Sequence, residues 1–226
     1  MEIISKLRHN KNFVTSFSIF VFLVTALGVG FLIGRVLVYE SPFDRLIVTS
    51  LYFTTQSNLL VFIVMSLFLL KKGDKHWFKV LALIGLIDIT ITGFVFHLFL
   101  ASYLSNINFM QHLLHTITPL FYISFYFIIL NHIFSLKDFW IGLLHPLIFL
   151  VSVYTWIHPL FGNLLSSVLT DFQGASYIYP FLDPSTYSNG FTGLLIFNLG
   201  LLMPVIILMT IGLIYLKSRI ENHISL

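Results

Sequence analysis

Residues 14–34 read VTSFSIFVFLVTALGVGFLIG, a stretch without a charged side chain. An α-helix needs about 20 apolar residues to cross the hydrocarbon layer of a bilayer, which is roughly 30 Å thick. An isolated strand in lipid would leave its backbone hydrogen bonds unmade. A stretch of this length and composition therefore indicates a membrane-spanning helix.

A basic leader with Lys6, Arg8 and Lys11 precedes this stretch, so a secretory signal peptide is an alternative interpretation. The apolar run is longer than the apolar region of a signal peptide, and no small-residue cleavage site follows it. We therefore expect the segment to be retained as the first membrane helix.

Five further stretches are apolar over comparable lengths. Together with the first, they predict membrane helices at about 14–34, 46–70, 79–103, 110–134, 139–158 and 191–216. Hydrophobic residues make up 58% of the chain and charged residues only 9%, whereas soluble domains carry about 25% charged residues. The sequence thus predicts an all-α, polytopic protein of the cell membrane, with one six-helix domain over residues 1–226.

Composition also excludes several classes of site. The chain has no cysteine, which rules out disulfides and cysteine-based haem or zinc ligation. Its histidines show no metal-binding spacing such as His-Glu-x-x-His, so we expect neither a metal nor another cofactor. The formal net charge of +3 comes from side chains in short loops and tails. It therefore does not indicate nucleic-acid binding.

The distribution of lysine and arginine predicts the orientation. Of twelve basic residues, ten fall in the two tails and in the loops after the second and fourth predicted helices, which leaves Arg35 and Arg45 on the other side. Lysine and arginine concentrate in cytoplasmic loops. Both termini are therefore expected in the cytoplasm.

The fifth connection, residues 159–190, is much longer than the others and must lie outside in this orientation. It is apolar and aromatic, and Tyr177, Tyr179 and Phe181 alternate along it. Long ordered loops are often functional. We expect this loop to fold back over the outer mouth of the bundle as a lid; an interfacial aromatic belt is the alternative.

The second predicted helix carries the polar run YFTTQSNLL at residues 52–60, near mid-membrane. At about 100° per residue, Thr54, Thr55, Ser57 and Asn58 share one arc, and Gln56 points away from it. This polar face must look into the bundle. It could serve a site, or it could simply join helices by hydrogen bonds.

The fourth predicted helix begins with QHLLHTITP at residues 111–119. His112 and His115 are three residues apart and therefore lie on one face. Pro119 has no N–H, so the carbonyl of His115 loses its usual partner within the helix.

Other polar residues also fall within apolar stretches. Those expected in the outer half are His97, His158 and Asn198, and His145 is expected nearer the cytoplasmic side in a structural role. Asp88 is the one carboxylate well inside a predicted helix. It could be neutral, paired with a polar neighbour, or a proton-coupling site.

Four motifs in order resemble the bacterial six-helix membrane-protein family known as Pr-six-Pr. They are the run at 52–60, ITGFV at 91–95, the His112-x-x-His115 pair followed by Pro119, and YIYPFLD at 177–183. That family is distantly similar to the eukaryotic androgen-induced and androgen-dependent membrane proteins. Those proteins are threonine hydrolases that cleave fatty acid esters of hydroxy fatty acids.

The resemblance implies roles for particular residues. The threonine in the Phe-x-Thr-x-x-Asn-Leu context is Thr55, which would be the nucleophile, and His115 would be the base. The same motifs imply supporting positions at Asn58, Thr54, His112, Tyr179 and Asp183. The expected function is intramembrane hydrolysis of lipid esters, with a membrane lipid as substrate.

Two other functions remain open on the sequence. A small-molecule transporter or binder would depend on Asp88 more than on Thr55. A non-catalytic membrane scaffold would depend on neither residue.

Overall fold

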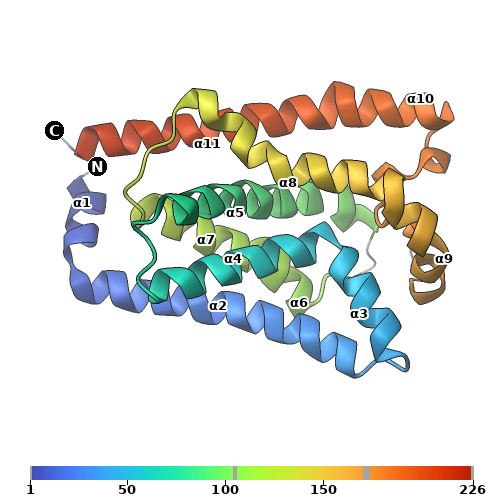
Figure 1. Ribbon diagram of the computed structural model, residues 1–226, viewed down its shortest axis with the longest axis horizontal. Helices are drawn as coiled ribbons and strands as arrows, with labels where there is room; N and C mark the ends of the chain where they lie inside the picture. Colours follow the sequence, from blue (N-terminus) through green and yellow to red (C-terminus); the bar gives the residue numbers. More distant parts are fainter. Residues whose placement is uncertain (1, 104–105, 170–173, 225–226) are drawn as a thin grey trace.

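The computed structural model describes residues 2–103, 106–169 and 174–224, and every regular element in these ranges is helical (Figure 1). The first half contains α1 (Glu2–His9), α2 (Lys11–Leu37), α3 (Pro42–Leu51), α4 (Phe53–Leu69), α5 (His76–Val95), η1 (Phe96–Leu100) and η2 (Ala101–Tyr103). The second half contains α6 (Phe109–His112), η3 (Leu113–Ile117), α7 (Thr118–Ile128), η4 (Leu136–Asp138), α8 (Phe139–Ser152), η5 (Val153–Ile157), α9 (His158–Val168), η6 (Ala175–Tyr177), η7 (Pro180–Leu182), η8 (Pro184–Thr186), α10 (Gly190–Leu195), η9 (Ile196–Leu202) and α11 (Met203–Ile224). The predicted all-helical class is confirmed for these residues.

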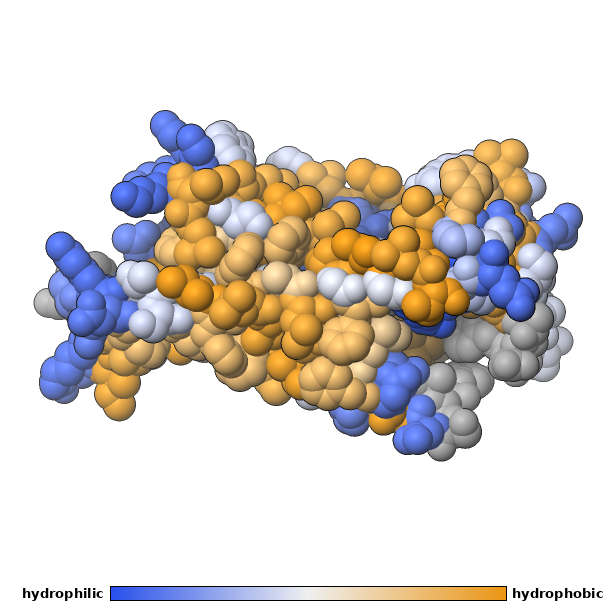
Figure 2. All heavy atoms as spheres, turned by 90° about the horizontal axis from the view of Figure 1, so that it is seen from below, coloured by the Kyte–Doolittle hydropathy of each residue, from blue (hydrophilic) through white to orange (hydrophobic). Residues whose placement is uncertain are grey.

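Several helices are long and apolar enough to cross a membrane. Within the described residues there are four, or five if a sharply bent pair counts as one span: Lys11–Leu37, His76–Leu100, Leu136–Val168, Gly190–Ile224, and the pair Pro42–Leu51 with Phe53–Leu69. The segment predicted at 110–134 is not among them, and its helix ends at Ile128. Figure 2 shows a broad apolar band between two hydrophilic ends, as a lipid-solvated surface requires. The chain is a multi-pass helical membrane protein.

The second predicted helix is not continuous. The axes of α3 and α4 meet at an angle of 81°, and Tyr52 between them has extended backbone angles. The prediction of one helix over 46–70 is therefore wrong, and α4 begins at Phe53. As a result, the polar run at 52–60 starts at a helix N-terminus instead of lying in a helix interior.

Wide π-helical turns interrupt several other helices, and three of them share a cause. Pro119, Pro159 and Pro204 each stand two residues after the end of a π-helical turn, η3, η5 and η9 respectively. A proline inside a helix removes one hydrogen bond and clashes with the preceding turn, and a widened turn accommodates it. Pro159 consequently does not end the fifth helix, which runs on through α9 to Val168. The predicted start of the long loop at 159 is wrong for this reason.

The remainder of the predicted loop is compact where it is described. Residues 174–189 form the short turns η6, η7 and η8 (part of the predicted lid, 170–173, lies outside the described residues). Ile178, Tyr179 and Leu182 are buried, and Tyr154 donates a hydrogen bond to the carbonyl of Leu182 at 2.8 Å. The segment therefore packs closely against neighbouring helices.

Helix α5 lies in the middle of the bundle and packs against α4, α7 and α8. Glycine permits two of these close approaches. A Cβ atom at Gly85 would lie 3.1 Å from the hydroxyl of Tyr122, and one at Gly93 would lie 3.0 Å from the carbonyl oxygen of His115. The helix that carries His115 is thereby held directly against α5.

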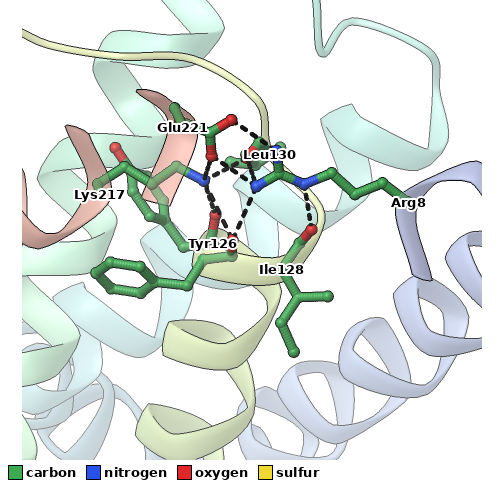
Figure 3. A network of polar contacts seen from close by, with 7 residues as sticks. Arg8, Tyr126, Ile128, Leu130, Lys217 and Glu221 are labelled. Carbon is green, nitrogen blue, oxygen red and sulfur yellow. Dashed lines mark hydrogen bonds and ion pairs between the residues drawn. The ribbon is translucent and has the colours of Figure 1, made fainter. Parts of the chain in front are cut away.

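The two chain termini lie at the same end of the bundle, where a charged cluster joins α1, α7 and α11 (Figures 1 and 3). Arg8 makes a bidentate ion pair with Glu221, with both N–O distances 2.6 Å, and Lys217 lies 2.7 Å from the same carboxylate. Arg8 and Lys217 also donate to carbonyls at the C-terminal end of α7, including those of Ile128 and Leu130. These two cations complete the hydrogen bonding that the end of a helix leaves unmade.

Candidate functional site

The break at Tyr52 places Thr54 in the first turn of α4, where backbone N–H groups lack acceptors within the helix. Its hydroxyl oxygen Oγ1 lies 3.2 Å from Nε2 of His115 on η3. The pair thus joins the start of one helix to a widened turn of another.

The hydrogen bonds of His115 define its tautomer. Nδ1 lies 2.9 Å from the carbonyl oxygen of Gln111, which can only accept, so Nδ1 carries the proton. In the neutral ring Nε2 is then the acceptor, and Thr54 donates its hydroxyl proton to it. The ring also stacks on Phe96 with 3.9 Å between centroids. Two contacts therefore hold Nε2 toward Thr54, and neither comes from Asn58 or the lid.

Tyr179 approaches the pair from the compact segment after α9. The amide of Thr54 donates to its hydroxyl at 3.4 Å, and that hydroxyl lies 3.5 Å from Oγ1 of Thr54. Burial raises the pKa of Tyr179 above the ordinary value, so the phenol keeps its proton.

The backbone that presents Tyr179 is strained. Ile178 has a φ of 70°, which is unfavourable for a β-branched residue, and the amide of Tyr179 donates to the carbonyl of Tyr177 at 2.8 Å in a tight turn. Strain of this kind persists only when the surrounding packing enforces it, and it concentrates at functional sites. Tyr177 stacks on His158, with 3.7 Å between ring centroids, whereas Tyr179 stacks on Phe181.

Two cavities meet at Thr54 and Tyr179. The larger, of about 370 Å³, is lined by Thr54, His115 and Tyr179 together with Arg35 and Arg45. The smaller, of about 90 Å³, has a mostly apolar wall from α5, α8 and α11. A molecule bound across both would present its middle to the Thr54–His115 pair.

The other predicted site residues are placed as follows. Thr55 lines the same large cavity as His115, but the hydrogen bond to His115 comes from Thr54. Asn58 donates to the carbonyl oxygens of Thr54 and Leu114 at 2.8 and 3.3 Å, which ties α4 to the helix of His115. Its neighbour Ser57 contacts Thr92 of α5 at 2.7 Å. Part of the polar face thus does serve to join helices.

His112 and Asp183 are not brought to the pair. His112 is exposed and lies outside the walls of both cavities. Asp183 accepts from the amide of Ser185 at 2.8 Å, in a local turn at the start of η8. The structure therefore gives neither residue a contact with Thr54 or His115.

The remaining histidines of interest have separate partners. His97 lies 2.9 Å from the hydroxyl of Thr116, and His158 lies 3.1 Å from the carbonyl of Ser176. Asn198 donates to the carbonyl of Phe181 at 3.0 Å. In the part of the chain that the structure describes, no three histidine or acidic side chains are grouped as metal ligands.

A second polar cluster was only partly anticipated from the sequence. Asp88 is fully buried and its Oδ2 lies 2.6 Å from Nδ1 of His145, while Nε2 of His145 lies 3.0 Å from Oε1 of Gln56. The amide nitrogen of Gln56 donates to the carbonyl of Ser50, which turns its oxygen toward His145. Both ring nitrogens therefore face side-chain oxygen atoms of neighbouring helices.

This cluster also positions the candidate site. Gln56 bridges the break between α3 and α4 through Ser50, and Phe53, next to Thr54, stacks on His145 at 5.1 Å. The sequence predicts that Gln56 points away from the polar arc formed by Thr54, Thr55, Ser57 and Asn58. A polar side chain that points away from this arc needs a partner elsewhere, and Asp88 is the one carboxylate inside the next predicted helix. These two features were the sequence signal for the second cluster.

No protein-family model, curated protein sequence or solved structure matches this chain. Its class is therefore defined by its own fold and site. It is a multi-pass helical membrane protein with two adjoining cavities, at which a threonine at a helix N-terminus is hydrogen-bonded to a histidine. The similarity to the Pr-six-Pr family remains a resemblance of motifs.

Proposed function

We propose that this protein hydrolyses lipid esters within the membrane, with Thr54 as nucleophile and His115 as general base. The observation that carries the proposal is the 3.2 Å contact between Oγ1 of Thr54 and Nε2 of His115, whose Nδ1 is held by the carbonyl of Gln111. A hydroxyl, an adjacent base and a group that orients the base are the parts that nucleophilic acyl transfer requires.

The chemistry proceeds in two halves. Oγ1 of Thr54 attacks the ester carbonyl while its proton passes to Nε2 of His115, and the imidazolium then protonates the departing alkoxide. The resulting acyl-threonine is attacked by a water molecule, which gives its proton to Nε2. The carboxylic acid leaves, and the threonine oxygen regains the proton from His115.

Tyr179 and the first turn of α4 can stabilise the negative charge that develops on the carbonyl oxygen. The hydroxyl of Tyr179 accepts from the amide of Thr54 and faces Oγ1 of Thr54 at 3.5 Å, so its proton can turn from Oγ1 to an oxyanion that forms there. The N-terminus of α4 adds its partial positive charge. Donors that are preorganised in this way often supply a large part of enzymatic rate enhancement.

The two cavities support a lipid as substrate. The apolar cavity between α5, α8 and α11 suits the few acyl carbons next to the ester carbonyl, and the remainder of the ester would occupy the larger cavity beside His115. The ester carbonyl then lies at Thr54, which borders both. Such a substrate reaches the site without leaving an apolar phase.

Thr54 and Thr55 are competing nucleophiles. The motif resemblance selects Thr55, and the hydrogen bond to His115 favours Thr54. Both side chains are partly exposed to the same cavity.

Covalent labelling tests this proposal. The purified protein in lipid nanodiscs is treated with a long-chain fluorophosphonate, and the modified residue is mapped by mass spectrometry. We expect modification on Thr54, and none in a His115→Ala variant. Modification on Thr55 would reassign the nucleophile, whereas absence of any threonine adduct would contradict the proposal.

A proton-coupled transporter is the second candidate, favoured by the fully buried Asp88 and its pairing with His145. Ionisable groups inside a membrane often serve proton or substrate pathways. A transporter would lose substrate flux in Asp88→Asn, and Thr54→Ala would transport normally.

We also propose that the chain crosses the cell membrane six times, with both termini in the cytoplasm. The shared location of the termini at one end of the bundle supports an even number of crossings (Figure 1). The segment from Phe109 to Ile128 would supply the sixth span, since it packs against α2 and α5.

A further inference from the structure

Arg45 is a buried cation without a matching anion in the described structure. Only 4% of its surface is exposed, and its Nε has no hydrogen-bond partner among the described residues. Its guanidinium carbon lies 5.1 Å from the ring centroid of Tyr39, and Arg35 adds a second positive charge nearby. Burying a charged group is costly unless a counter-ion or hydrogen bonds compensate for it.

Arg35 lines the same large cavity from the end of α2. In residues 2–103, 106–169 and 174–224, no ion pair involves Arg35 or Arg45, and the nearby Asp44 is engaged with Ser41 at 2.6 Å. The other end of the bundle differs, because there Arg8 and Lys217 share Glu221. The two arginines next to the candidate site are thus available to a ligand.

Arg35 and Arg45 differ from the other lysines and arginines in their position along the chain. They are the only basic residues outside the tails and the predicted cytoplasmic loops, and both reach the cavity that contains Thr54 and His115. The N-terminus of α4 borders the same cavity and favours negative charge there.

We propose that Arg45 and Arg35 bind an oxyanion, a carboxylate or a phosphate, at the head of the lipid that enters this cavity. The planar guanidinium donates two parallel hydrogen bonds to either group. The inference rests on the proposed function in that it narrows the substrate from lipid esters in general to lipid esters that carry an acidic group.

The surroundings favour a lipid over a free anion. Leu32, Leu114, Val168 and Leu169 line the same cavity, and Thr54 and Tyr179 connect it to the apolar one. A chain attached to the oxyanion would bury this surface, which a free phosphate ion could not do.

Equilibrium binding to a Thr54→Ala variant in phosphatidylcholine nanodiscs tests the proposal without requiring turnover. The probes are a radiolabelled long-chain fatty acid, a lysophosphatidic acid and the uncharged alcohol of the same chain. We expect at least one acidic probe to bind about tenfold or more tighter than the alcohol, because charge-assisted hydrogen bonds are the strong ones. The better acidic probe identifies the carboxylate or the phosphate as the preferred head.

Substitutions then locate the preference. Arg45→Gln should bring the affinity for the acidic probe down to that for the alcohol, and Arg35→Gln should lower it several-fold. The side chain of Arg35 is exposed, so Arg35→Gln remains informative if Arg45→Gln does not fold. Lys72→Gln, on an exposed turn after α4, is the matched control. It should bind the acidic probe with the same affinity as the Thr54→Ala protein.

Three results would overturn the inference. The first is equal affinity of the Thr54→Ala protein for both acidic probes and the alcohol. The second is an acidic preference that survives both arginine substitutions. The third is full displacement of the acidic lipid by excess inorganic phosphate, which would show a free-anion site. The binding experiment uses a protein without the Thr54 hydroxyl, so its outcome does not depend on ester hydrolysis. Failure of the proposed hydrolase function would therefore be distinguishable from failure of this inference.

Discussion

Oγ1 of Thr54 lies 3.2 Å from Nε2 of His115, although 61 residues separate them in the chain. The contact exists because α4 starts anew at Phe53 and because η3 widens the helix before Pro119. It brings a hydroxyl donor and a neutral imidazole acceptor together inside the membrane domain.

Replacement of His115 should remove turnover as fully as replacement of its partner. His115→Ala deletes the proton acceptor for both halves of the reaction, and residues that act as one unit fail together instead of additively. Ester hydrolysis by His115→Ala, Thr54→Ala and the double variant should therefore be equally low. A double variant much slower than either single variant would indicate independent roles.

Tyr179→Phe tests the stabilisation of the oxyanion. The ring keeps its packing against Phe181, where the centroids are 5.3 Å apart, but the donor is lost. We expect kcat to fall by about a hundredfold, as for removal of one oxyanion-hole donor, with KM nearly unchanged. An unchanged kcat would exclude this role.

Asp88→Asn should affect stability more than chemistry. No step of the proposed reaction uses the carboxylate, so appreciable turnover should remain, whereas loss of the charge that faces His145 should lower the thermal midpoint in detergent. Loss of a measured substrate flux in Asp88→Asn, in a variant that melts like the parent and with normal flux in Thr54→Ala, would instead favour the proton-coupled transporter.

Glu221→Gln should destabilise the end of the bundle that holds the termini. Arg8 and Lys217 would remain close together without their shared carboxylate, at a cost of about 3 kcal/mol for breaking a buried ion pair. Thermal unfolding in detergent measures this loss. Glu2→Gln is the control, since its pair with Lys6 is largely exposed and should contribute little. Equal midpoints for both variants would contradict a structural role of the cluster.

Single-cysteine labelling tests the number of crossings, and the absence of native cysteine makes it direct. Lys72→Cys and Lys137→Cys should be protected from an impermeant maleimide in intact cells, and Asn106→Cys should react. Labelling of Lys72→Cys but not Lys137→Cys, or the reverse, would show that the segment between Phe109 and Ile128 does not cross.

The sequence predicted the helical class and the polar composition of the site, but not the helix break that forms it. No glycine or proline occurs between Phe43 and Lys72. Gln56 bridges the bend at Tyr52 by a bond to the carbonyl of Ser50, and His145 on the distant helix α8 faces Gln56 from the other side. Local propensity contains no signal for such tertiary contacts.

Other features had readable signals. The spacing of His115 and Pro119 indicated that the carbonyl of His115 lacks its usual helical partner, and the structure places a π-helical turn there. Arg35 and Arg45 stood out as exceptions to the charge bias, but only the cavity shows that they converge. The choice between adjacent threonines needed three-dimensional geometry, because both lie on the predicted polar arc.

The most direct test of the central claim is the rate of lipid-ester hydrolysis by the purified protein and two matched variants, Thr54→Ala and Thr55→Ala, each verified as folded by its thermal midpoint. Both variants lose the same atoms from the wall of one cavity, so packing losses should be similar. We predict that Thr54→Ala lowers turnover by about a thousandfold or more, while Thr55→Ala stays within about tenfold of the parent. Parent-like hydrolysis by folded Thr54→Ala would contradict the account.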